Sequence, residues 1–123
     1  MSQRISAITF AVRDMATSVS FYAACGFAIV YGGSDAAFTS LRLGDAYVNL
    51  TLQPDYAPTW WGRVIFHVDN VDALYWAVTT QGLSPATAPR NASWGERYFH
   101  IVDPDGNELS FAKPLTPSMT ECQ

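Results

Sequence analysis

Basic residues are scarce in this sequence of 123 residues. Six arginines and one lysine, Lys113, stand against eleven acidic residues, which gives a formal net charge of −4 at pH 7. Phosphate backbones are bound by clustered basic residues, so this shortage argues against nucleic acid as a partner. We interpret the acid excess mainly as a solubilising surface, although it is also compatible with a cationic or neutral small molecule.

Cysteines and long apolar runs are also few. The two cysteines, Cys25 and Cys122, do not indicate a disulfide framework. The chain starts Met-Ser-Gln-Arg-Ile-Ser, without the apolar stretch of a secretory signal, and no apolar run is long enough to cross a membrane. We therefore expect a cytoplasmic protein without membrane contact, in which Cys25 is a small buried apolar side chain.

Internal repetition, in contrast, is pronounced. Segment 8–15, Ile-Thr-Phe-Ala-Val-Arg-Asp-Met, resembles segment 64–71, Val-Ile-Phe-His-Val-Asp-Asn-Val, at an offset of 56 residues. The same offset relates Gly26 to Gly82. Each copy has the pattern of a strand, a helix cap, an amphipathic helix and a terminating glycine. Two copies of one unit are expected to share a core and to enclose a space between them.

Each copy predicts the order β-α-β-β-β. The helices are expected to begin at caps formed by Asp14 and Asn70 and to end at the two glycines. The strands are expected near residues 7–12, 27–31, 37–43 and 46–52 in the first copy, and near 64–68, 96–102 and 107–112 in the second. The proline-rich segment 83–93 predicts only a short, irregular or edge strand. We expect one domain over residues 1–113, with modules at about 4–53 and 62–113 and a loose tail at 114–123.

The predicted strands have two unlike faces, because side chains alternate along a strand. One face is almost wholly apolar and is expected to receive the helices. The other face mixes polar and aromatic residues, which suits the wall of a ligand pocket. Its main polar and aromatic members are Asn49, Arg63, His67, Tyr98, His100, Glu108 and Ser110.

Several motifs, in this order, make the chain resemble the vicinal oxygen chelate superfamily, which includes glyoxalase I, bleomycin-resistance proteins, fosfomycin-resistance enzymes and extradiol dioxygenases. They are Val-Arg-Asp-Met at 12–15 with Phe21-Tyr22 and Gly26-Phe27, Phe-His-Val-Asp-Asn-Val-Asp-Ala-Leu at 66–74, and Trp-Gly-Glu-Arg-Tyr at 94–98 leading into Asp-Pro-Asp-Gly-Asn at 103–107. The resemblance spans about residues 4 to 113. It implies an α+β fold of two βαβββ modules forming a curved mixed sheet around a cleft, with helices on the outer face, and a homodimer.

Enzymes of that superfamily bind a divalent metal through the first and last strands of each module, usually with His, Gln or Glu. The resemblance places these positions on Ala7, Asn49, Arg63 and Ser110. Ala7 has no donor atom, Ser110 is a poor donor, Asn49 offers only an amide oxygen, and Arg63 carries a fixed positive charge. We therefore expect the inherited metal site to be absent and no cofactor to be bound.

A relocated metal site would need His67, His100 and Glu108, which are metal-competent and share the polar face. If the outer strands of the module run parallel, His67 and Glu108 lie apart. We therefore prefer to interpret both histidines as hydrogen-bonding side chains that line the cleft.

Arg63 supports two interpretations. It could anchor a carboxylate, phenolate or carbonyl of a ligand, or it could form an internal ion pair with Glu108. Both stay open at this point.

The tryptophans and the charged turn also have alternatives. Trp60, Trp61 and Trp94 could be stacking walls for a planar ligand or ordinary packing residues. Trp76 lies off the apolar stripe of its helix and is assigned to solvent or to a subunit contact. We assign the 103–107 segment to turn geometry, and Glu96 and Arg97 to surface or structural pairing.

The sequence favours a metal-free protein of the glyoxalase/bleomycin resistance type that binds or sequesters an aromatic or antibiotic-like small molecule. One rival is a metal-dependent lyase, isomerase or dioxygenase with a relocated metal, or an acid–base catalyst using His100 or Glu108; another is a structural or regulatory domain with a filled cleft. The predicted ligand-binding residues are Asn49, Arg63, His67, Trp94, Tyr98, His100, Glu108 and Ser110, with none assigned to catalysis or to metal.

Overall fold

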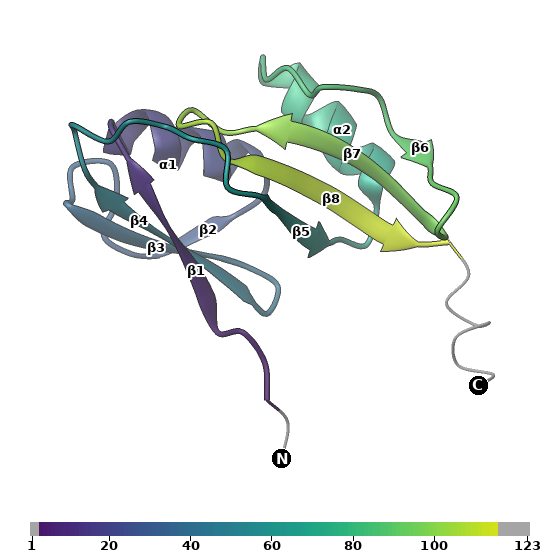
Figure 1. The fold of residues 1–123 in the computed structure, drawn as a ribbon, viewed down its shortest axis with the longest axis horizontal. Coiled ribbons are helices and arrows are strands. Elements are labelled where there is room, and N and C mark those ends of the chain that lie inside the picture. The colour runs from purple at the N-terminus through teal and green to yellow at the C-terminus, as the bar shows by residue number, and fades with distance from the viewer. Residues whose placement is uncertain (1–2, 116–123) are drawn as a thin grey trace. The chain divides into compact units, whose positions relative to one another are not determined.

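The structure is a computed structural model that describes residues 3–115. The chain divides into two compact units, one of Met1–Trp60 with Asp103–Gly106 and the other of Trp61–Val102 with Asn107–Gln123. Each unit contains one βαβββ module with its own four-stranded mixed sheet and one helix (Figure 1). The fold is therefore α+β, as predicted.

The first unit has strand order β1-β4-β3-β2, with β1 parallel to β4 and the other pairs antiparallel. Its elements are β1 (Ala7–Val12), α1 (Met15–Ala24), β2 (Ala28–Tyr31), β3 (Phe38–Leu43) and β4 (Ala46–Leu52). The predicted cap is confirmed, since the Asp14 side chain accepts a hydrogen bond from the Thr17 backbone N–H at 3.1 Å. The helix ends at Ala24 with Cys25 as its C-cap, and Gly26 follows with φ +97°, a conformation that favours glycine.

The core of the first unit lies between α1 and one face of this sheet. Phe10 of β1 stacks on Tyr22 of α1 with ring centroids 6.1 Å apart, and Val48 and Leu50 of β4 are fully buried. Each such side chain contributes about 1.5–3 kcal/mol of burial free energy. The apolar face predicted from the alternation is thus the face that the helix covers.

The turn between β7 and β8 belongs to the first unit, although the strands it joins belong to the second. Its carboxylates are buried: Asp103 is 4% exposed and Asp105 is 3% exposed. The Tyr22 hydroxyl donates to Asp103 Oδ2 at 2.6 Å. Ser18 donates to Asp105 Oδ2 at 3.2 Å, and Arg13 Nε donates to Asp105 Oδ1 at 2.8 Å. Buried carboxylates need such donors, so this turn, which was correctly predicted as one, also completes the first unit.

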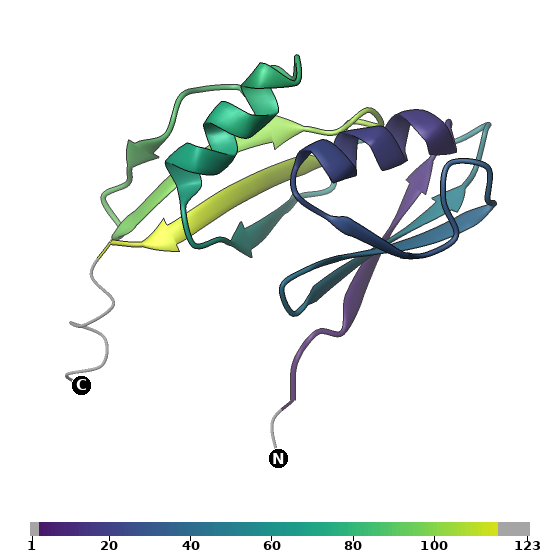
Figure 2. The same ribbon diagram turned by 180° about the vertical axis from the view of Figure 1, so that it is seen from behind.

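The second unit has strand order β5-β8-β7-β6, with β5 parallel to β8. Its elements are β5 (Arg63–His67), α2 (Val71–Thr80), β6 (Arg90–Asn91), β7 (Glu96–Val102) and β8 (Glu108–Pro114). Asn70 caps α2 by accepting from the Ala73 N–H at 2.9 Å, as predicted. The helix lies across one face of the sheet, behind β7 and β8 in Figure 1 and in front of them in Figure 2. Phe66, Phe99 and Phe111 pack together on that face with ring centroids 5.5 and 5.6 Å apart.

Most predicted boundaries agree with the structure to within a residue or two. The 83–93 segment forms only the two-residue edge strand β6, as its prolines predicted. The last strand was predicted to end at residue 112 but continues to Pro114, and the Leu115 N–H donates to Gly95 O at 2.9 Å. The rest of the predicted tail, residues 116–123 with Cys122, lies outside the described residues. The assignment of residues 1–113 to one domain and the presence of a cleft stay predictions.

Neither helix in the described part of the chain is long and apolar enough to span a membrane.

Replacing Tyr22 by phenylalanine is expected to lower the free energy of unfolding by about 1–3 kcal/mol at pH 7, because Asp103 loses a donor. Burial and the nearby Asp103 carboxylate raise the pKa of Tyr22 well above its ordinary value of 10.0. Above pH 10 the unfolded tyrosine therefore loses its proton while the folded one keeps it, so the wild-type protein loses stability as the pH rises. The difference in the free energy of unfolding between wild type and Tyr22→Phe should thus shrink above pH 10, by at most about 1.4 kcal/mol per pH unit.

Urea unfolding of both proteins at pH 7, 10 and 11 measures this difference. Burial also raises the pKa of Cys25, to about 12. Cys25 is present in both proteins, so its contribution to the pH dependence of stability cancels in the comparison. A difference that stays constant with pH would contradict the prediction.

Candidate ligand-binding site

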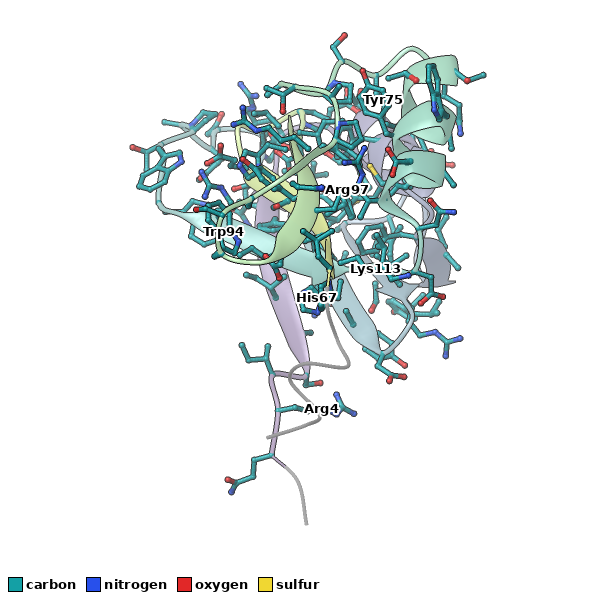
Figure 3. The ribbon with its side chains drawn as sticks, turned by 90° about the vertical axis from the view of Figure 1, so that its right-hand side faces the viewer. Arg4, His67, Tyr75, Trp94, Arg97 and Lys113 are labelled. Atoms are coloured by element: carbon teal, nitrogen blue, oxygen red, sulfur yellow. The ribbon has the colours of Figure 1, made fainter. Side chains whose placement is uncertain are left out.

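The packing of α2 decides which side chains of the second sheet are left for other contacts. Phe99 and Ile101 of β7 and Leu109 and Phe111 of β8 are buried on the helix side. The alternate residues therefore lie on the opposite face, which we call the far face. Figure 3 shows Trp94 on the other side of the ribbon from Tyr75 of α2. The predicted site residues on the far-face strands are Arg63, His67, Tyr98, His100, Glu108 and Ser110.

Three aromatic rings form a row along β7 on the far face. The ring centroids of Trp94 and Tyr98 lie 5.6 Å apart at 30°, and those of Tyr98 and His100 lie 4.9 Å apart at 48°. Trp94, in the loop before β7, is 68% exposed, whereas Tyr98 is 6% exposed. The row thus presents an accessible indole next to the buried ring of Tyr98, with the half-buried His100 ring beyond it.

The Trp94 indole is held in place by Glu96. Its Nε1–H donates to Glu96 Oε1 at 3.0 Å, while His67 Nε2 lies 2.9 Å from Glu96 Oε2. A carboxylate can only accept, so the His67 Nε2 carries the proton. The hydrogen bond from His67, followed by that from Trp94, lowers the pKa of Glu96 from its ordinary value. Glu96 therefore remains ionised at neutral pH, and both of its oxygens are occupied.

Arg90 is a far-face residue that the sequence did not reveal. It pairs directly with Tyr98 across β6 and β7, so both side chains lie on the same face. Its Nε donates to the Tyr98 hydroxyl at 3.0 Å, and its guanidinium carbon lies 5.6 Å from the centre of that ring. A two-residue strand in a proline-rich segment shows no alternation, so no sequence signal assigned Arg90 to a face.

His100 is held as a neutral base. Burial is the main cause that lowers its pKa, and Arg63 and Arg90 lower it further while Glu108 opposes them. Its Nδ1 is buried and has no hydrogen-bond partner among the described residues. At pH 7 the imidazole is therefore mainly uncharged and behaves as an aromatic ring.

Arg63 forms the internal ion pair that was one of its two interpretations. It lies opposite Glu108 in the parallel β5–β8 register, and its Nη2 is 3.2 Å from Glu108 Oε1. Both side chains retain solvent contact, so the pair contributes at most about 1 kcal/mol. Arg97, on the helix side, is likewise paired, with both carboxylate oxygens of Asp72 at 2.7 and 2.8 Å. This confirms its structural assignment.

The residues at the inherited metal positions do not form a donor set for a divalent ion. In the first unit, Ala7 has no donor and the Asn49 amide donates to Thr9 Oγ1 at 3.3 Å. In the second unit, Arg63 is cationic, and Ser110 is 3% exposed and neutral. These groups lack the anionic or imidazole ligands that such ions require.

The residues proposed for a relocated metal are not brought together. His67 lies opposite Ala112 in the β5–β8 register, four positions beyond Glu108, which corresponds to about 13 Å along a strand. Within residues 3–115, no group of three His, Cys, Asp or Glu side chains is placed to hold a metal ion.

The remaining tryptophans lie elsewhere. Trp60 and Trp61 are 69% and 47% exposed, and the Trp61 indole donates to Asn107 Oδ1 at 2.7 Å. Trp76 is 66% exposed on α2, in agreement with its assignment to solvent or a subunit contact.

A cavity of about 350 Å³ lies on the helix side of the second sheet, at the start of α2. Its lining includes Asp72 and Arg97, which neutralise each other, and Asp69 and Lys113. Because its charges are balanced and it contains no aromatic ring, we place the candidate site on the far face.

Comparisons with known proteins agree with this fold. Residues 4–111 match the Glyoxalase/Bleomycin resistance protein/Dioxygenase superfamily. The chain is 28% identical to a bleomycin resistance protein of Klebsiella pneumoniae, over 79% of this chain and 82% of that protein. The crystal structure of a bleomycin-binding protein complexed with bleomycin has a TM-score of 0.74 at 25% identity, covering 90% of this chain and 98% of that one. A bleomycin resistance determinant encoded on the transposon Tn5 has a TM-score of 0.75 at 25% identity, with the same coverage.

The chain therefore belongs to the glyoxalase/bleomycin resistance/dioxygenase superfamily, which confirms the resemblance seen in its sequence. Its relatives in both comparisons include bleomycin resistance proteins.

The pKa of His100 is expected to lie below its ordinary value of 6.5 and to respond oppositely to two neighbours. Arg90→Gln removes a positive charge and should raise it, whereas Glu108→Gln removes a negative charge and should lower it. Proton NMR titration of the imidazole C2–H signals measures both shifts, with His67→Gln to assign the two histidines. A wild-type value above 6.5, or shifts in the reverse directions, would refute this description of the far face.

Proposed function

We propose that this protein binds a planar aromatic small molecule on the far face of its second sheet, without a metal and without changing the ligand chemically. The observation that carries this proposal is the row of Trp94, Tyr98 and His100, with the exposed indole fixed by Glu96. A ring that is held in place before binding loses little conformational entropy when a ligand stacks on it. Among the polar side chains of the far face, the exposed His67 would orient the ligand.

The relatives support a role in sequestration. One of them is solved as a bleomycin-binding protein in complex with bleomycin, and another is a bleomycin resistance determinant. An antibiotic-like compound with planar rings therefore lies within the proposed ligand class. We include in the proposal a cytoplasmic homodimer, which the sequence and the resemblance favour.

The polar groups of the far face support binding rather than acid–base catalysis. The buried Nδ1 of His100 is not placed to take a proton from a substrate, and Glu108 is engaged by Arg63. The enzyme alternative would need a metal donor set, which these side chains do not form, or a base that is placed against a substrate.

Trp94→Ala is expected to weaken the binding of a planar antibiotic or aromatic about 10-fold, because the ligand loses its stacking partner. Trp76→Ala is the matched control, because Trp76 is 66% exposed and Trp94 is 68% exposed, but Trp76 lies on α2. Isothermal titration calorimetry with bleomycin and a panel of planar aromatics measures the affinities. Equal losses in both variants, or no binding by the wild type, would exclude this site.

Binding by tag-free protein is expected to be unchanged after dialysis against a chelator, because no step of the proposed binding uses a metal. Elemental analysis of the dialysed protein is the companion measurement. Stoichiometric iron, nickel, zinc or manganese that survives dialysis would support the enzyme alternative instead.

A further inference from the structure

We propose that the ligand of the far face is an anion, a planar aromatic carboxylate or a group of like charge, and that Arg90 is its anchor. This inference rests on the proposed function and specifies the class of its ligand. It is carried by the pairing of the arginines, by the occupied acids of the far face and by the position of Arg90 beside the ring row.

Three arginines in the described part of the chain form ion pairs with carboxylates, and Arg90 is not one of them. Arg13 is paired with Asp105, Arg63 with Glu108 and Arg97 with Asp72. Arg90 has no carboxylate partner within residues 3–115 and donates only its Nε, to the uncharged Tyr98 hydroxyl. Its two terminal amino groups therefore keep their donors for another molecule, in the forked geometry that matches a carboxylate.

The acids of the far face are already occupied and do not compensate Arg90. The two oxygens of Glu96 accept from His67 and Trp94. Glu108 is paired with Arg63. A ligand on this face therefore meets Arg90, whose terminal donors are open, and carboxylates that already have partners. An anionic group gains more binding free energy there than a cationic group does.

The position of Arg90 joins the charge to the rings. Arg90 is directly opposite Tyr98 in the β6–β7 register, and Tyr98 is the middle ring of the row. The hydrogen bond to the Tyr98 hydroxyl holds the guanidinium over that ring, with its carbon 5.6 Å from the ring centroid. A flat ligand stacked beside Trp94 can thus place a ring substituent against Arg90, with the guanidinium oriented before binding.

The test compares three probes of one shape at pH 7: 2-naphthoate, 2-naphthamide and 2-naphthylmethylammonium. Calorimetric titration of the wild type should give the tightest binding for the naphthoate, about 10-fold tighter than the neutral amide, and the weakest for the ammonium. Arg90→Gln should remove the preference for naphthoate while leaving the affinity for the amide within about twofold. Arg90→Lys should keep part of the preference, because it keeps the charge but loses the fork.

Arg42→Gln is the matched control, since it makes the same charge change at an exposed position of β3 in the first unit. It should keep the wild-type order of affinities. Circular dichroism and thermal unfolding verify that each variant is folded. Equal binding of naphthoate and amide, or a preference that survives Arg90→Gln, would overturn the inference while leaving the proposed function intact. Failure of all three probes to bind the wild type would overturn both.

Discussion

The packing of α2 against the second sheet is the constraint on which the rest of the site depends. Phe99 and Phe111 are fully buried on the helix side, and strand geometry then sends their neighbours Tyr98, His100 and Ser110 to the other face. A shift of one residue in either strand would exchange the two sets and bury charged groups under the helix. The packing of the apolar core under α2 thus fixes which side chains lie on the far face.

Much of the fold could be predicted from the sequence because its signals are local. Alternation gave the strands, Asp14 and Asn70 gave the helix starts, and the repeat gave two modules of the same type. The site was less predictable because its pairings are not local. Arg90 stood in a segment without periodicity, and only the register with Tyr98 assigns it a role. The choice between two interpretations of Arg63 likewise needed the register that sets it opposite Glu108.

The changes at the inherited metal positions are consistent with one another in physical terms. A guanidinium cannot occupy the place of a metal ligand unless its charge is balanced, and Glu108 balances Arg63 at 3.2 Å. At Arg63, a position that the resemblance assigns to a metal ligand, the far face therefore carries a protein cation with its own counter-charge. Such a face keeps polar groups that can donate hydrogen bonds in fixed directions, and its row of aromatic rings offers a surface on which a ligand can stack.

The buried turn between β7 and β8 has a consequence for the order in which the molecule folds. The hydroxyl of Tyr22 and its acceptor Asp103 are 81 residues apart in the chain, so this contact closes a long loop. Contacts of such separation form late, and during synthesis from the N-terminus the acceptor emerges only after most of the second module. The first unit is therefore complete only when residues 103–106, which lie between β7 and β8, are in place. The two modules are alike in sequence, but only one of them can finish folding without a segment from outside its own repeat.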